Sequence, residues 1–138
     1  MTTDPGRIEL RLTQDARLMA VVVRAVESFA ERVGFAAAAT QALGEAAEQA
    51  CNDSFAQMDD APGQVGVIVE EFADRIEITV EHEGDAGPAA GLDTFGAFGG
   101  AGGAGLALLA RVDRVQYQTE NGVSRMKLVK YLGPAKPA

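Results

Sequence analysis

Residues 65–82, VGVIVEEFADRIEITVEH, decide the fold, because they contain two strand patterns joined by the short turn Ala73-Asp74. The patterns run from Val65 to Phe72 and from Arg75 to His82. In the second pattern apolar residues alternate with polar ones, which is the period of a strand with one buried face. Two such neighbouring strands predict the centre of a β-sheet. The expected buried face of the second strand carries Ile76, Ile78, Val80 and His82.

The sequence on either side predicts further strands and two long helices. Residues 7–12 alternate like a half-buried strand. Apolar residues at three- and four-residue steps from Leu18 to Val33 predict an amphipathic helix that starts near Thr13 and ends before Gly34. The elements expected after it are a helix over 36–57, the two central strands, a short helix over 106–112, and strands over 113–119 and 123–132 with the hairpin turn Asn121-Gly122.

Between residues 84 and 105 lie nine of the sixteen glycines, a density too high for the interior of a helix or strand. We expect this segment to form a mobile, lid-like loop. No repeat or domain boundary is found, so we predict one domain over residues 1–138 with its core at about 7–132. The order of elements predicts an α+β fold: a two-layer α/β sandwich in which helices cover one face of a mixed or antiparallel sheet.

The composition agrees with one folded domain. The chain has 138 residues, of which 47% are apolar and 23% are charged, as in ordinary globular proteins. Every apolar run is interrupted well before the roughly 18 residues that a membrane span needs, and residues 1–8 contain no apolar signal region. Cys51 is the single cysteine, which excludes an internal disulfide. We therefore expect a cytoplasmic protein that makes no contact with a membrane.

The same composition excludes several classes of function. One cysteine and one histidine cannot assemble a Cys/His zinc site, and no nucleophile-elbow pattern surrounds a serine. The net charge of −8 argues against binding nucleic acid, because neutralising phosphates requires a basic face. An acidic surface is instead compatible with a protein partner that carries basic residues.

A polar stripe on the second predicted helix is the first candidate site. Glu45, Glu48, Gln49 and Asn52 follow one another at steps that place them on one side of a helix. A carboxylate and an amide one turn apart can activate a water and share a hard cation. The alternative is an ordinary solvated helix face, which the spacing alone favours by roughly three to one.

Two glycine-containing stretches are the other candidates. Residues 80–88, VEHEGDAGP, end a strand in glycines, which lets a ligand approach the backbone closely or simply forms a turn. Residues 99–106, GGAGGAGL, lead into a predicted helix, whose first N–H groups attract anions such as phosphate. Flexible linkers have the same composition, and neither the Walker nor the Rossmann fingerprint is present.

In this order, these motifs resemble the GHKL (Bergerat-fold, histidine-kinase-like) ATPases, and within them the anti-sigma-factor serine/threonine kinases of bacterial partner switching, the RsbW/SpoIIAB type. Residues 42–55, ALGEAAEQACNDSF, are similar to the first motif helix of that branch. Residues 78–87 are similar to its first glycine box. Residues 102–109, 113–117 and 126–130 are similar to its C-terminal half. The resemblance covers roughly residues 7–132 and depends on the ordered set of motifs.

The resemblance implies roles for the polar residues of the second helix. It makes Glu45 the catalytic base and places Gln49 at the Mg²⁺ position, where the family has asparagine. A second alignment, Glu48 with Asn52, restores the glutamate-to-asparagine spacing, so Asn52 is the other candidate metal ligand; it ranks second because it brings Phe55 too close to the amide. Gln49 is one methylene longer than asparagine, and Mg²⁺ tolerates little departure from octahedral geometry.

The resemblance also assigns the nucleotide contacts. His82 stands where the family has an aspartate that accepts a hydrogen bond from the adenine amino group. Neutral histidine can accept through one ring nitrogen but lacks the charge, or it is simply a core residue. Ala86 and Ala104 are further departures from the family pattern. The glycines implied in binding phosphate and adenine are Gly84, Gly87, Gly103 and Gly105.

The function that the resemblance implies is an anti-sigma-factor-type regulator. It would bind ATP and Mg²⁺, phosphorylate a serine of an anti-sigma-factor antagonist, bind a sigma factor through another surface, and form a homodimer. Two alternatives remain open. One is a pseudo-kinase of the same fold that binds partner proteins without nucleotide, which His82, Ala86 and Gln49 favour. The other is an unrelated, non-enzymatic α+β interaction module.

Overall fold

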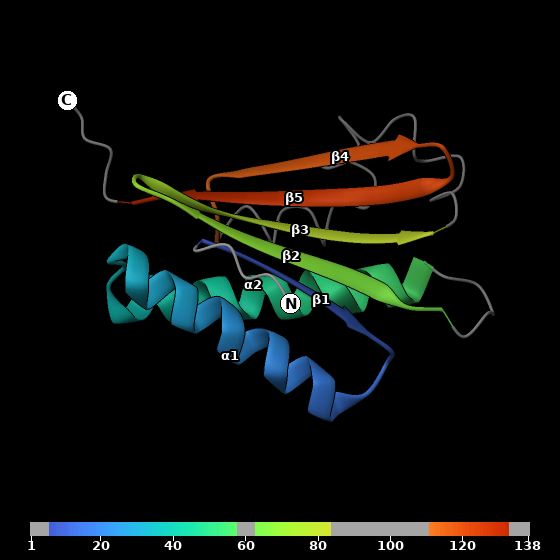
Figure 1. The fold of residues 1–138 in the computed structure, drawn as a ribbon, viewed down its shortest axis with the longest axis horizontal. Helices are drawn as coiled ribbons and strands as arrows, with labels where there is room; N and C mark the ends of the chain where they lie inside the picture. The colour runs from blue at the N-terminus through green and yellow to red at the C-terminus, as the bar shows by residue number, and fades with distance from the viewer. Residues whose placement is uncertain (1–5, 58–62, 84–110, 133–138) are drawn as a thin grey trace.

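The computed structural model describes residues 6–57, 63–83 and 111–132. Over these ranges the chain forms two layers, a five-stranded antiparallel sheet and a pair of helices that cover one of its faces (Figure 1). The predicted α+β sandwich is therefore confirmed, with an antiparallel sheet. In chain order the elements are β1 (Arg7–Leu12), α1 (Ala16–Val33), α2 (Ala37–Gln57), β2 (Val65–Phe72), β3 (Arg75–Glu83), β4 (Arg114–Glu120) and β5 (Val123–Tyr131).

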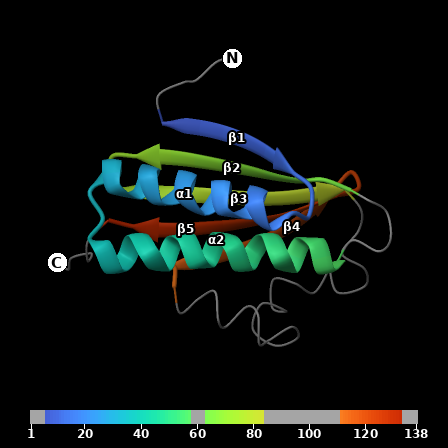
Figure 2. The same cartoon turned by 90° about the horizontal axis from the view of Figure 1, so that it is seen from below.

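The sheet has the strand order β1-β2-β3-β5-β4, so β1 and β4 form its two edges (Figure 2). The predicted hairpin of residues 65–82 lies beside the centre of the sheet, with Phe72 paired to Arg75 across the turn. The second hairpin turns at Asn121-Gly122, whose φ angles of 54° and 78° are both positive. Two positive φ angles are the signature of the tight turn that this dipeptide favours, so this prediction is confirmed.

Helix α1 begins two residues later than the sequence pattern indicates. The N-cap is Asp15 rather than Thr13, because the Asp15 carboxylate accepts a hydrogen bond of 2.8 Å from the backbone N–H of Arg17. The helix ends at Gly34, which has a left-handed φ of 112° as expected for a C-cap. Neither α1 nor α2 has the length and apolar content to cross a membrane, and the described ranges contain no other helix.

The two helices pack closely because α2 carries a glycine at their contact. A Cβ atom on Gly44 would lie 3.0 Å from Glu27 Oε2 and 3.1 Å from Val23 Cγ1 of α1. Beneath the helices, the alternating residues of β2, β3 and β5 form the core with the buried faces of α1 and α2. The fully buried side chains include Leu43, Ile76, Ile78 and Leu128. This packing fixes α2 over the sheet and therefore fixes which of its residues face outward.

Candidate functional site

The polar residues of α2 form two rows that face different parts of the molecule. Glu45, Gln49 and Asp53 follow at four-residue steps, so they lie along one side of the helix. Glu48 and Asn52 form the second row, also four residues apart. The single polar stripe expected from the sequence therefore consists of two adjacent rows. The two alignments considered for the catalytic base and its metal ligand correspond to these two rows.

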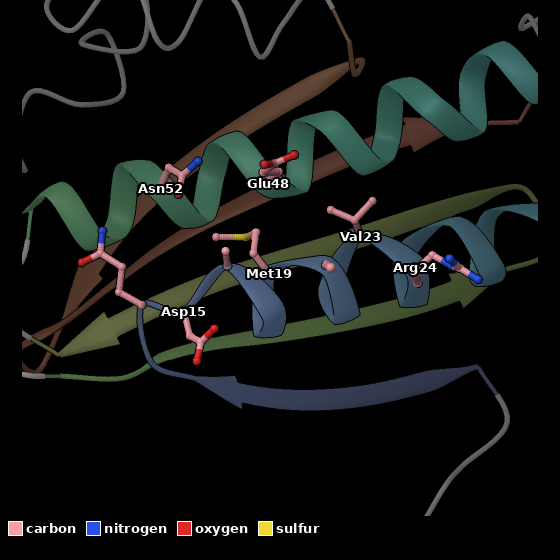
Figure 3. Close-up of a pocket in the computed structure, with 9 residues that line it drawn as sticks. Asp15, Met19, Val23, Arg24, Glu48 and Asn52 are labelled. Atoms are coloured by element: carbon pink, nitrogen blue, oxygen red, sulfur yellow. The ribbon is translucent and has the colours of Figure 1, made fainter.

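The Glu48–Asn52 row opens toward α1. Both residues line a pocket with a cavity volume of about 560 Å³, between α2 and the N-terminal half of α1 (Figure 3). Its apolar part comes from α1, including Met19 and Val23, and Arg24 stands on its rim. This pocket lies on the helical layer, on the side of α2 nearest α1. A cation held by Glu48 and Asn52 would bind between the helices rather than against the sheet.

Within the described residues, Glu45 accepts two hydrogen bonds, both from polar side chains. Its Oε1 accepts a hydrogen bond of 3.2 Å from Arg111 Nε, and its Oε2 accepts one of 3.2 Å from Gln41 Nε2. The Glu45 side chain is 46% exposed, so the carboxylate remains accessible to solvent. Arg111 directly follows residues 84–110 and precedes β4, so this ion pair joins α2 to the chain entering β4. The contact orients the Glu45 carboxylate toward the β4 side of α2.

His82 is the buried polar residue at the end of β3. It continues the core face of Ile76, Ile78 and Val80 and is 5% exposed. Among the residues that the structure describes, neither ring nitrogen has a hydrogen-bond partner. Burial lowers the pKa of the imidazole below its ordinary value of 6.5, so His82 is neutral at pH 7. A neutral ring presents one donor and one acceptor, and both are left unused here.

The strand register places two hydroxyl residues in line with His82. His82 is directly opposite Ser124 of β5, and Ser124 is directly opposite Thr119 of β4. Residues opposite one another on antiparallel strands point to the same face. Three polar residues therefore form a row across β3, β5 and β4 on the face that α1 and α2 cover. Ser124 is buried and Thr119 is exposed, so the row runs from the core to the surface.

Asp53 is a second residue with an unpartnered buried polar atom. Within the described part of the chain, its Oδ2 is buried and accepts no hydrogen bond. Burial raises the pKa of this carboxyl above its ordinary value of 3.8. Asp53 belongs to the C-terminal third of α2, and this end of α2 lies at the same end of the molecule as the C-terminus of β3 (Figure 2). The unpaired groups of Asp53 and His82 therefore belong to one end of the sandwich.

The predicted metal ligands Gln49 and Asn52 do not belong to one row. Asn52 lines the pocket beside α1, whereas Gln49 is not among the residues that line it and stands one turn after Glu45. Within the described ranges, no three His, Cys, Asp or Glu side chains gather in a cluster able to hold a metal ion. The phosphate and adenine glycines expected from the sequence, as well as the predicted lid and most of the short helix over 106–112, lie outside the described residues. They are Gly84, Gly87, Gly103 and Gly105.

Sequence analysis missed three residues of this region. Asp53 stands one turn after Gln49, and the four-residue step was the signal that could have included it. Ser124 and Thr119 become neighbours of His82 only through the pairing of β3, β5 and β4. The alternation of β5 does place Ser124 on the same face as Met126 and Leu128, so its burial was predictable.

Comparison with known proteins does not assign the chain to a family. No protein-family model matches it, and no curated protein matches it significantly. Its function must therefore be inferred from the fold and from the residues described above.

Proposed function

We propose that the chain is a nucleotide-binding regulatory protein of the GHKL type, which binds ATP with Mg²⁺ and transfers the γ-phosphate to a serine or threonine of a partner protein. The partners proposed are an anti-sigma-factor antagonist as the substrate and a sigma factor as the regulated protein. The observation that carries the proposal is His82, buried at the end of β3 with neither ring nitrogen paired to any described residue. A buried polar group without a partner costs stability, so it suggests a group that a ligand satisfies.

The chemistry of the surrounding residues supports a purine at this position. A neutral imidazole can accept a hydrogen bond from an exocyclic amino group and donate one to a ring nitrogen. Ser124, directly opposite, supplies a hydroxyl on the same face. The resemblance found in the sequence assigns the adenine contact to this same residue. The burial of His82 and the motif order both support a site at the end of β3.

Glu45 is the residue we propose as the base for phosphoryl transfer. It is solvent-accessible and lies on the row that faces away from the α1 pocket, while Arg111 and Gln41 orient its carboxylate. Phosphoryl transfer depends mainly on positioning and charge neutralisation, which a small site can provide. Gln49, one turn further along this row, is the proposed Mg²⁺ ligand through its amide oxygen. Glu48 and Asn52 then belong to the pocket between the helices and take no part in the reaction.

A matched pair of variants on α2 tests this assignment. Glu45→Ala and Glu48→Ala each remove one exposed carboxylate, three residues apart on the same helix. We expect both variants to bind ATP, and only Glu45→Ala to lose ATP turnover, by at least about 100-fold. Binding is measured by calorimetry with and without Mg²⁺, and turnover by release or transfer of the γ-phosphate. Equal turnover in wild type and Glu45→Ala removes Glu45 from the mechanism.

A second candidate function is a partner-binding protein of the same fold that binds no nucleotide. The Arg111–Glu45 ion pair favours it, because an arginine occupies the carboxylate that the reaction needs. Calorimetry separates the two candidates directly. Absence of ATP binding up to about 1 mM, with Mg²⁺ present, contradicts the enzyme and leaves the partner-binding protein. Micromolar binding contradicts the second candidate.

A further inference from the structure

Nothing in the described part of the structure fixes the tautomer of the His82 ring. On the same face of the sheet, its neighbours are Val80 in its own strand, Val65 directly opposite on β2 and Ser124 directly opposite on β5. Val65 and Val80 are apolar and fully buried, and neither ring nitrogen bonds to Ser124 or to any other described residue. The tautomer of a histidine is normally set by the hydrogen bond that one of its nitrogens makes. In His82 both tautomers therefore remain open.

No carboxylate of the described residues holds the ring either. Glu81 and Glu83 flank His82 in β3, so they point to the opposite face of the sheet. On that face Glu81 accepts a hydrogen bond of 2.8 Å from Arg125. Asp53 belongs to the same end of the sandwich (Figure 2), but its Oδ2 is not bonded to the imidazole. A carboxylate partner would keep one ring nitrogen permanently as a donor, and His82 has none among the described residues.

A neutral ring with a free tautomer can make two opposite contacts from one position. When the proton is on the far nitrogen, the nitrogen that faces a ligand accepts a hydrogen bond. When the proton is on the near nitrogen, that nitrogen donates one. The exchange removes one proton from one ring nitrogen and adds one to the other, so the ring stays neutral and does not have to turn. An ionised carboxylate in the same place could only accept.

Purine bases differ in this same property at position 6. Adenine carries an amino group there, which donates, whereas guanine and hypoxanthine carry an oxo group, which accepts. A fixed acceptor binds the amino group and disfavours the oxo group, because two buried acceptors then face each other without a hydrogen. A buried imidazole with both nitrogens free can satisfy either group. Burial also lowers the pKa of His82, which keeps the ring neutral and so able to accept.

We propose that the purine site at the end of β3 takes 6-oxopurine nucleotides as well as ATP, and that His82 is the residue that determines this specificity. His82 accepts a hydrogen bond from a 6-amino group in one tautomer and donates one to a 6-oxo group in the other. This inference rests on the proposed function, because it requires a site that holds a purine nucleotide, and it extends the substrate class to ITP and GTP. The experiment must therefore distinguish a site that binds no nucleotide from a site that binds only adenine.

Three triphosphates that differ around position 6 of the base provide this distinction. ATP carries the amino group, ITP carries the oxo group, and purine riboside triphosphate carries only hydrogen there. ITP is preferred to GTP because it lacks the additional 2-amino group. In calorimetry with Mg²⁺, we expect the dissociation constants of ATP and ITP to lie within about tenfold of each other. The dissociation constant of purine riboside triphosphate should be at least about tenfold higher than either.

The other outcomes of this titration have different meanings. If ITP binds more than about tenfold more weakly than ATP, the site recognises adenine alone; the proposed function then stands and the dual recognition is wrong. If all three triphosphates bind equally, nothing reads position 6, and the dual recognition is again wrong. If none binds up to about 1 mM, the proposed function fails and this inference fails with it.

A matched pair of variants shows whether His82 is the residue responsible. The amide of His82→Gln contains both an acceptor oxygen and donor N–H groups, whereas His82→Leu contains neither. We expect His82→Gln to keep ATP and ITP within about tenfold of each other, and His82→Leu to bind all three triphosphates with similar, raised dissociation constants. A preference of His82→Leu for ATP and ITP over purine riboside triphosphate contradicts the proposal. Circular dichroism checks that both variants are folded.

The single histidine of the chain allows the tautomer to be observed without any variant. In untagged wild type labelled with ¹⁵N-histidine, all imidazole signals come from His82, and protonated and unprotonated ring nitrogens have well-separated ¹⁵N chemical shifts. We expect the ring nitrogen that is protonated in the ATP complex to be unprotonated in the ITP complex, and the other nitrogen to change in the opposite sense. A histidine with only a structural role would keep one tautomer in both complexes. The same tautomer in both complexes overturns the proposal even if both nucleotides bind.

Discussion

The two faces of the sheet treat polar side chains in opposite ways. On the open face, charged residues pair with one another, either along one strand or between neighbouring strands. Glu77 accepts from Arg75 at 2.7 Å and lies 3.3 Å from Lys127, and Glu81 accepts from Arg125 at 2.8 Å. On the face toward the helices, four buried polar atoms of the described residues have no partner. Three of them lie at one end of the sandwich, the two ring nitrogens of His82 and Oδ2 of Asp53, and the fourth is Oε1 of Glu71, whose Oε2 accepts a hydrogen bond from Arg32.

This difference separates charged residues whose pairing stabilises the fold from buried polar residues whose unpartnered atoms lower the free energy of unfolding. Paired charges on a half-exposed sheet contribute modestly to stability and keep the sheet face soluble. Buried polar atoms without partners reduce stability, and proteins retain such groups mainly at functional sites. The covered end of the sandwich, with His82 and Asp53, is therefore where we propose the ligand site.

The largest effect expected from this comparison is at Glu77. Burial alone would raise its pKa, but hydrogen bonds and charges from Lys127 and Arg75 outweigh burial and lower the pKa below 4.5. Glu77→Ala removes both interactions, and we expect the free energy of unfolding to fall by about 1.5 kcal/mol at neutral pH. Because the folded-state pKa is lowered, this contribution is present above the unfolded pKa and is lost as the pH falls. Urea unfolding of wild type and Glu77→Ala at about pH 7 measures the loss of stability, and the same experiment at about pH 3.5 shows whether the difference between them shrinks.

The control for Glu77 lies on the same face. Glu120 contacts Arg125 at 3.9 Å and its side chain is 58% exposed, so Glu120→Ala should change stability by less than about 0.5 kcal/mol. Equal losses in the two variants would mean that the short, half-buried pairs of Glu77 contribute no more than a long surface contact. The assignment of a stabilising role to the open face would then be wrong.

Local sequence patterns predicted the fold well because the fold depends on local physics. The alternation in residues 65–82, the C-cap at Gly34 and the Asn121-Gly122 turn each follow from the conformational preference of a few neighbouring residues. The N-cap was placed at Thr13 instead of Asp15 because both residue types can cap a helix, and only the geometry shows which carboxylate or hydroxyl reaches a free N–H.

The candidate site was less predictable because it depends on contacts between distant segments. The spacing of Glu45, Glu48, Gln49 and Asn52 indicated a common side of α2 but could not show that Glu48 and Asn52 line a pocket beside α1. The line from His82 through Ser124 to Thr119 requires the strand order β3-β5-β4, which local patterns do not give. The pairing of Arg111 with Glu45 joins residues that are 66 positions apart in the chain.

A smaller effect of opposite sign is expected at Asp53. Its buried Oδ2 has no partner, and burial raises the pKa of this carboxyl above 3.8. Asp53→Asn keeps the shape of the side chain and removes the charge, so we expect the free energy of unfolding to rise by about 1 kcal/mol at neutral pH. Because the folded-state pKa of Asp53 is raised, the carboxyl becomes protonated and neutral in the folded protein as the pH falls. The stability gain of Asp53→Asn over wild type should therefore disappear as the pH falls toward 3.8.

Glu48→Gln is the matched control for Asp53→Asn. It neutralises an exposed carboxylate on the same helix and should change stability by no more than about 0.5 kcal/mol. If Asp53→Asn destabilises the protein, then the carboxylate is satisfied in the folded state and does not belong with His82 as an unpaired group. Chemical unfolding of both variants at neutral pH decides this.

The smallest effect expected is the pH dependence contributed by His82. Burial lowers its pKa below 6.5, so the unfolded chain binds a proton more readily than the folded one. The stability that depends on a neutral ring is therefore present above pH 6.5 and is lost as the pH falls through this value toward the folded-state pKa. Between about pH 7.5 and about pH 5.5, the free energy of unfolding of wild type should fall more steeply than that of His82→Gln, which cannot gain a proton. Equal slopes would mean that the imidazole takes up a proton as readily in the folded protein as in the unfolded chain. This is the result expected if hydrogen-bond partners already satisfied its ring nitrogens.

A ligand that binds the neutral ring of His82 should stabilise wild type more at the higher pH. Thermal unfolding with and without about 1 mM ATP at both pH values measures that difference.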